Sequence, residues 1–177
     1  MHAVSNSTLA VTSYWQEEEL TTRIRTLLER EYPDGLAVIK QLIENADDAV
    51  ATEVKLLYDE RENSDAHVKL LDPGMKSLQG PALWVYNNST FRDQDFDNLV
   101  KLNAATKQRC TDKVEQFGLG FNTIYNVTDV LALISRNYVV YLEPHKTYLG
   151  KAIRDKRGIK LNLKASGKWL HDFSYQF

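Results

Sequence analysis

One short segment of the sequence carries side chains that could bind a metal ion beside a phosphate. In QLIENADDA, residues 41–49, the polar residues Gln41, Asn45 and Asp48 are spaced four and three positions apart. If this segment is helical, their side chains project in one direction. An Asn carbonyl is a hard oxygen ligand, which suits a Mg²⁺ ion that keeps most of its waters and bridges phosphates. This polar line borders apolar positions, so it must face a wet cavity or find partners inside the protein.

A second segment, FGLGFNTIYN at residues 117–126, places Gly118 and Gly120 just before a helical pattern. Free backbone N–H groups at such a turn lie at the positive end of a helix dipole and favour phosphate. A third feature is the pair Asn87-Asn88 at the end of an expected strand. Together the three features predict a nucleotide pocket. Each alone has a plainer interpretation, because Gly-x-Gly often serves as a turn and a polar line on a helix often faces solvent.

Composition limits the other functions. The 177 residues are 43% hydrophobic and carry 22 basic against 24 acidic side chains, a net charge of −2. This length and apolar content predict one domain. The near-neutral charge disfavours nucleic-acid and membrane-surface partners. The single cysteine, Cys110, excludes an internal disulfide and a multi-cysteine zinc site. With no span-length apolar run and no signal-like start, we expect a cytoplasmic protein.

The candidate residues need helices to position them. Leucine and isoleucine recur at helical spacing over residues 20–28, and a turn follows at 33–35. The next helix, residues 36–50, holds the Gln41–Asn45–Asp48 line, and Lys40–Glu44 is expected as an ion pair on its surface. Its expected core stripe consists of Leu36, Ile39, Leu42, Ile43 and Ala46.

The remaining elements are read in the same way. Asp93 is expected to cap a short helix, residues 103–116 to form a loop, and residues 59–81 to be a long excursion. Strands are expected at residues 53–58, 82–86, 130–135, 138–142 and 158–163. The strand at 82–86 is expected to be buried, with Trp84 and Tyr86 packed in the core. This order predicts a two-layer α/β sandwich over residues 14–177, preceded by a flexible tail at 1–13.

The motifs in this order resemble a known family. QLIENADDA resembles the first nucleotide motif of the Bergerat-fold (histidine-kinase-like) ATPases, the group that holds the ninety-kilodalton heat-shock chaperones. FGLGFNTIYNVTD resembles the glycine motif that closes over the phosphates. From about Leu20 to Phe177, the chain is most similar to the chaperone-like repeats of the sacsin family. The similar strings are NADDAVATEVKLLYDER, LLDPGM, QGPALWVYNNSTF and GLGFNTIYNVTDV. The resemblance implies a mixed sheet covered by helices on one face.

The resemblance also implies roles for individual residues. Asn45 matches the Mg²⁺ ligand, and Asp48 matches an acidic residue on the pocket wall. The phosphate side of the pocket is matched by Lys107 in the lid segment and by Gly118, Gly120 and Phe121. The implied cofactors are ATP or ADP with Mg²⁺. The implied partners are protein clients, other chaperones and other domains of a larger chain.

Three departures from the family pattern affect activity. Gln41 replaces the catalytic Glu, and a general base is typically worth about 10²–10⁴ in rate. The adenine-reading motif is replaced by the residues around Asn87 and Asn88, either of which could restore one contact. Ile159 stands where the family has a Thr. The sequence therefore predicts a chaperone or co-chaperone domain whose ATP pocket is degenerate and whose hydrolysis is weak or absent. The alternatives are a nucleotide-independent interaction module and a slow Mg²⁺-dependent ATPase with a base from elsewhere, such as Glu44.

Overall fold

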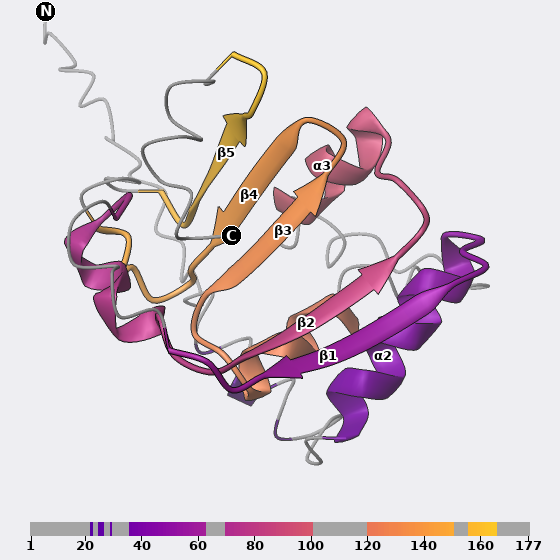
Figure 1. Ribbon diagram of the computed structural model, residues 1–177, viewed down its shortest axis with the longest axis horizontal. Helices are drawn as coiled ribbons and strands as arrows, with labels where there is room; N and C mark the ends of the chain where they lie inside the picture. Colours follow the sequence, from indigo (N-terminus) through magenta and orange to yellow (C-terminus); the bar gives the residue numbers. More distant parts are fainter. Residues whose placement is uncertain are drawn as a thin grey trace, which may run out of the picture.

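The computed structural model describes residues 36–62, 70–100, 120–150 and 156–165, together with Thr22, Arg25, Thr26 and Glu29. The elements are α2 (Leu36–Asp48), β1 (Val54–Asp59), the 3₁₀ helix η1 (Pro73–Leu78), β2 (Ala82–Asn87), α3 (Asp93–Val100), the 3₁₀ helix η4 (Gly120–Asn126), β3 (Leu131–Ser135), β4 (Tyr138–Leu142) and β5 (Gly158–Asn162). In Figure 1 the strands form the near layer, and α2, α3 and η4 lie behind them. The predicted α/β class is confirmed.

The strands of the described residues pair into two antiparallel sheets, where one mixed sheet was expected. One sheet has the order β1-β2 and the other β3-β4-β5. The segment after β2 is joined to the end of β3 by the Phe91 N–H, which donates to Ser135 Oγ at 3.0 Å. In a single mixed sheet, backbone hydrogen bonds would join neighbouring strands. Here a side-chain hydrogen bond joins the segment after β2 to β3.

The core lies on both sides of β4. Alternate residues of a strand point to opposite faces, and β4 is buried on both. One cluster consists of Met75, Val139, Tyr141 and Leu149, and the other of Phe96, Leu131, Val140 and Leu142. Burial raises the pKa of Tyr141 to about 12, so its phenol is neutral at physiological pH. Because η1 supplies Met75 to the first cluster, the excursion expected at 59–81 contains part of the core.

The buried face of α2 differs from the predicted stripe. Leu36 is 73% exposed and Ile43 is 46% exposed, whereas Val38 and Ala46 are buried. At 100° per residue, Val38 and Ala46 lie on one side of the helix together with half-buried Leu42. Helix α2 therefore buries a face that is rotated from the predicted one. Hydrophobicity alone did not predict which face of the helix is buried.

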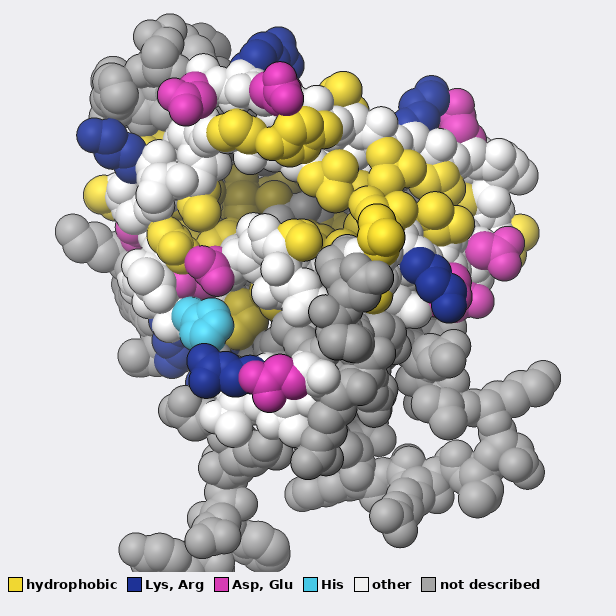
Figure 2. Space-filling model, turned by 90° about the horizontal axis from the view of Figure 1, so that it is seen from below, with side chains coloured by type: hydrophobic (Ala, Val, Ile, Leu, Met, Phe, Trp, Pro, Cys, Tyr) yellow, Lys and Arg dark blue, Asp and Glu magenta, His cyan; other side chains and the backbone are white. Residues whose placement is uncertain are grey.

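The expected burial of β2 is wrong. Both faces of the pair β1–β2 are partly open, and Leu83, Trp84 and Tyr86 are exposed. Figure 2, which looks at the molecule from below, shows apolar side chains spread over this side and around a hollow, with charged groups at the margin. A two-stranded sheet has two faces, and both must be covered for its side chains to be buried. An apolar sequence alone therefore does not show that a strand is buried.

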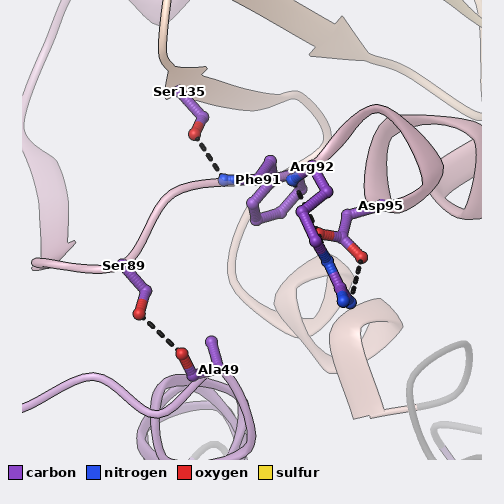
Figure 3. Close-up of polar contacts among 6 residues, drawn as sticks. All are labelled: Ala49, Ser89, Phe91, Arg92, Asp95 and Ser135. Carbon is purple, nitrogen blue, oxygen red and sulfur yellow. Dashed lines mark hydrogen bonds and ion pairs between the residues drawn. The ribbon is translucent and has the colours of Figure 1, made fainter.

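The helix that follows β2 is capped by a different residue from the one expected. Asp93 is the first residue of α3, and its carboxylate pairs with Arg136 at 2.7 Å. The Arg92 N–H donates to Asp95 Oδ2 at 2.7 Å, as Figure 3 shows. Asp95 thus accepts a backbone N–H at the start of the helix, as the acidic member of a capping box does.

Other predicted elements are confirmed. The hairpin of β3 and β4 turns at Arg136-Asn137, and β5 pairs antiparallel with β4. The ion pair Lys40–Glu44 is present at 3.5 Å. The described residues of the first helix are helical, and Thr26 Oγ1 donates to the Thr22 carbonyl at 3.0 Å. None of the helices in the described part of the chain is long and apolar enough to cross a membrane.

Candidate functional site

The helix with the polar line packs against the segment that begins at Gly120. Helix α2 and the 3₁₀ helix η4 are in contact, with Val38 and Ala46 on the buried side of α2. Asn45 is half-buried, and its Nδ2 is buried without a hydrogen-bond partner in the described part of the chain. An unpartnered buried amide costs about 1–3 kcal/mol, so its presence favours a position with a use beyond packing.

Two buried polar residues of η4 had not been singled out from the sequence. Asn122 and Thr123 are only 3% and 1% exposed, and both make polar interactions. Burial raises the pKa of Tyr125 on the same segment, so this phenol stays neutral. The signal in the sequence is the placement of Asn122 and Thr123 directly after the glycine motif, where two adjacent polar residues start a short helix. With Asn45 on α2, they provide polar groups on both elements of a packed pair.

Gln41 lies one helical turn before Asn45. Its Nε2 donates to Glu44 Oε2 at 2.5 Å, and the same Glu44 carboxylate faces Lys40. Gln41 is half-buried, while Glu44 is exposed. The Gln41 amide, which the resemblance sets at a general-base position, is therefore oriented by a surface carboxylate. Glu44 accepts this hydrogen bond on the exposed surface of the helix.

Asp48, the last residue of α2, is exposed to solvent. The chain leaves the helix through Val50, whose φ of 56° lies in the left-handed region. The Ala49 carbonyl accepts a hydrogen bond from Ser89 Oγ at 2.6 Å (Figure 3). Asp48 is thus at the rim of the helix end, and the buried part of the polar line is Asn45.

Asn88 connects the ends of two elements. Its Oδ1 accepts from the Thr52 and Glu53 N–H groups at 2.9 and 3.2 Å, and its Nδ2 donates to Thr52 Oγ1 at 2.8 Å. The Asn87 side chain accepts from the Ser89 N–H at 3.0 Å, as in an Asx turn. Residues 87–92 therefore form a connecting segment. Its hydrogen bonds link β2 to the end of α2, to β3 and to α3. Both ends of the Asn88 amide are committed to these hydrogen bonds.

The structure describes some of the remaining candidate site residues and not others. Gly120 is the first residue of η4, and Phe121 packs against the cluster that contains Phe96. Lys107 and Gly118 lie outside the described residues. Ile159, at the family's Thr position, is in β5 opposite Tyr141 and packs against the core. The structure thus packs α2, which carries Asn45, against η4. It commits Asn87 to a hydrogen bond with Ser89 and Asn88 to hydrogen bonds with Thr52 and Glu53.

Similarity to known proteins agrees with this arrangement of motifs. The family model described as "Sacsin domain" matches residues 17–177. Sacsin of Homo sapiens is 46% identical over 164 residues, which cover 92% of this chain and 4% of sacsin. The chain therefore spans a small part of the length of this curated relative. Since the family model and the alignment both include the α2 and η4 motifs, the chain belongs to the sacsin domain family.

Proposed function

We propose that this chain is a chaperone-type domain that has kept the phosphate side of a nucleotide pocket and lost efficient hydrolysis. The observation that supports this best is the packing of α2, which carries the half-buried Asn45, against η4. In this proposal the domain works by binding protein clients or other chaperones in the cytoplasm, and Mg²⁺–ATP or Mg²⁺–ADP binds feebly.

The side chains near Asn45 suit the phosphates and Mg²⁺ of a nucleotide, but the residues on the adenine side do not suit its base. Among the described residues, no three His, Cys, Asp or Glu side chains group into a metal site. Mg²⁺ would therefore depend on Asn45 Oδ1, on waters and on the phosphates, as is usual for this ion. The resemblance assigns the phosphate contacts to Gly118 and Gly120, and a bound Mg²⁺ would neutralise phosphate charge. On the adenine side, Asn88 is already hydrogen-bonded at both ends of its amide.

The first prediction concerns binding. Mg²⁺–ADP and Mg²⁺–ATP should raise the melting temperature of the 177-residue chain saturably, with a Kd on the order of 0.1–1 mM. At ten times Kd, the gain in stability is about 1.4 kcal/mol. Asn45→Ala should abolish this gain, because it removes the metal ligand. The matched control is Asn98→Ala, an exposed amide on α3, which should leave binding unchanged.

Calorimetry with the same nucleotides gives the affinity directly. Absence of any saturable effect would favour the nucleotide-independent interaction module. Tight binding that survives Asn45→Ala would contradict the assignment of the metal ligand.

The second prediction concerns hydrolysis. Gln41→Glu alone would place two carboxylates at hydrogen-bonding distance, so the useful variant is the exchange Gln41→Glu with Glu44→Gln. In this variant the hydrogen bond between positions 41 and 44 is kept with its direction reversed, and a base stands one turn before Asn45. Turnover of Mg²⁺–ATP should rise by about 10²-fold or more above the native chain.

Glu44→Gln alone and Gln94→Glu on exposed α3 are the controls, and neither should change turnover. A native chain that already turns over rapidly, and loses this with Asn45→Ala, would show that a base comes from elsewhere. If the exchange variant turned over Mg²⁺–ATP no faster than the native chain, Gln41 would not be the cause of the low activity.

A further inference from the structure

The strands β1 and β2 expose large apolar side chains on both of their faces. Six large side chains on them are between 42% and 63% exposed: Leu56, Leu57, Tyr58, Leu83, Trp84 and Tyr86. Figure 2 shows apolar side chains spread over this side of the molecule, with charges of both signs at the margin. Contiguous apolar surface with a polar rim is typical of a protein interaction site.

The outer edge of β1 carries backbone groups that no described strand pairs with. Among the described residues β1 pairs only with β2, and in Figure 1 it lies on the side of β2 away from β3. The Asn88 N–H donates to the Glu53 carbonyl, so the residues at 53, 55, 57 and 59 turn their backbone groups toward β2. The backbone groups of Val54, Leu56 and Tyr58 therefore point outward. Such an edge is a template for another strand.

The side chains on one face of this edge form a charge pattern that complements itself. Lys55, Leu57 and Asp59 share a face of β1, with Glu53 before the strand and Arg61 after it, so the order along the chain is acidic, basic, apolar, acidic, basic. An antiparallel copy reads the same pattern in reverse. With Leu57 opposite Leu57, each Lys55 faces Asp59 of the second copy. Both charged residues on this face of the strand then lie opposite their complements.

Neighbouring registers do not have this property. Antiparallel pairing requires opposed residues to present their backbones alike, so the twofold axis must pass through a residue of the strand. An axis through Leu56 would set Glu53 against Asp59, and one through Tyr58 would set Lys55 against Arg61. An axis through Lys55 would oppose two lysines. Like charges directly opposite one another are destabilising, so the register centred on Leu57 is favoured among these four.

We propose that the outer edge of β1 binds β1 of a second copy of this chain, antiparallel about a twofold axis at Leu57. The result is a four-stranded sheet of order β2-β1-β1-β2. Leu57 neighbours Trp84 on β2, so an apolar stripe Trp84–Leu57–Leu57–Trp84 crosses the new interface. On the other face, Leu56 lies opposite Tyr58.

The charges at this edge are held in place within the monomer. Lys55 Nζ lies 2.8 Å from Glu53 Oε1, and Arg61 pairs with Asp59 at 2.6 Å. Each of these ion pairs joins two residues of the same chain. In the dimer, Lys55 and Asp59 would each gain a second partner on the other copy. An isologous contact of this kind closes with two copies, since it uses the same edge on both. A single added strand pair is a small interface, so we expect a Kd in the micromolar range.

Sedimentation equilibrium of the 177-residue chain, from about 5 to 200 μM, tests the proposal. The native chain should show a monomer–dimer equilibrium. Lys55→Glu alone and Asp59→Lys alone should each weaken it by about tenfold or more, because each creates two like-charge contacts per dimer. An equimolar mixture of these two variants should dimerise as the native chain does, since Glu at 55 then faces Lys at 59 and Lys55 faces Asp59.

The mixture separates pairing from folding, because a misfolded variant would not be rescued by the other one. Lys76→Glu on η1 and Asp97→Lys on α3, both exposed, are the matched controls and should dimerise alone and mixed like the native chain. A native chain that stays monomeric over the whole range overturns the proposal. So does a mixture that associates no better than its two components, or a pair of β1 variants that dimerise as well as the native chain.

Discussion

Replacing Glu143 with glutamine is expected to lower the free energy of unfolding by about 2–4 kcal/mol. The Glu143 side chain is fully buried. Its Oε1 accepts hydrogen bonds from the Thr147 and Tyr148 N–H groups, and its Oε2 accepts one from the Leu149 N–H at 2.7 Å. Charge-assisted bonds of this kind are about twice as strong as neutral ones. The carboxylate therefore stabilises the turn that follows β4.

Glutamine has nearly the same shape, so the expected loss comes from chemistry and not from volume. Whichever way the amide is oriented, its NH₂ group would face at least one backbone N–H that now has an acceptor. The effect should extend to the core, because Leu149 is fully buried against Met75 and Tyr141. Urea denaturation followed by circular dichroism measures the change in free energy of unfolding.

Glu62→Gln provides the matched control, since Glu62 is exposed. Surface changes of this type usually stay within about 0.5 kcal/mol. If Glu143→Gln also stayed within that range, the turn at 147–149 would not depend on the carboxylate. Glu143→Asp keeps the charge with a shorter reach, and it should fall between the glutamine variant and the native chain.

The importance of Glu143 could not be predicted from the sequence. The strand that precedes it was predicted correctly, because YVVYL is apolar throughout and a two-residue turn separates it from β3. An acidic residue after such a strand normally marks the return to solvent. Its burial depends on three N–H groups that come later in the chain, and no periodicity in the sequence records that contact.

The candidate site shows the same division between local and tertiary information. The placement of Asn45 on a helix follows from residues 36–48, whose spacing predicts α2. The commitment of Asn88 to Thr52 and Glu53 involves residues more than thirty positions apart, so the sequence left it open as an adenine contact. The orientation of α2 was also missed, because it depends on the packing of η4 against the helix. Motif spacing selected the candidate groups, and packing determines which of them are hydrogen-bonded to other parts of the protein.

Gly74→Ala is expected to destabilise the protein by about 1–3 kcal/mol or more, through the same turn that Glu143 holds. A Cβ at Gly74 would lie 2.3 Å from the Tyr148 carbonyl oxygen, with the Tyr148 Cα and carbonyl carbon also within 2.9 Å. The obstacle is backbone, so relief requires η1 to move away from the turn, and Met75 would leave the core with it. Gly74 is therefore needed for the close approach of two chain segments, since its φ is not positive.

Gly80→Ala is the control that isolates this contact. A Cβ at Gly80 meets nothing within 4 Å, and its φ is not positive either. Alanine there should be neutral or stabilise by about 0.4–1 kcal/mol, because it restricts the unfolded chain. The two glycines are only six positions apart, so the pair of variants compares one substitution with and without the steric contact in thermal and urea melts. Equal stabilities would mean that η1 can shift without cost, and the Met75 cluster would then not depend on the approach of Gly74 to Tyr148.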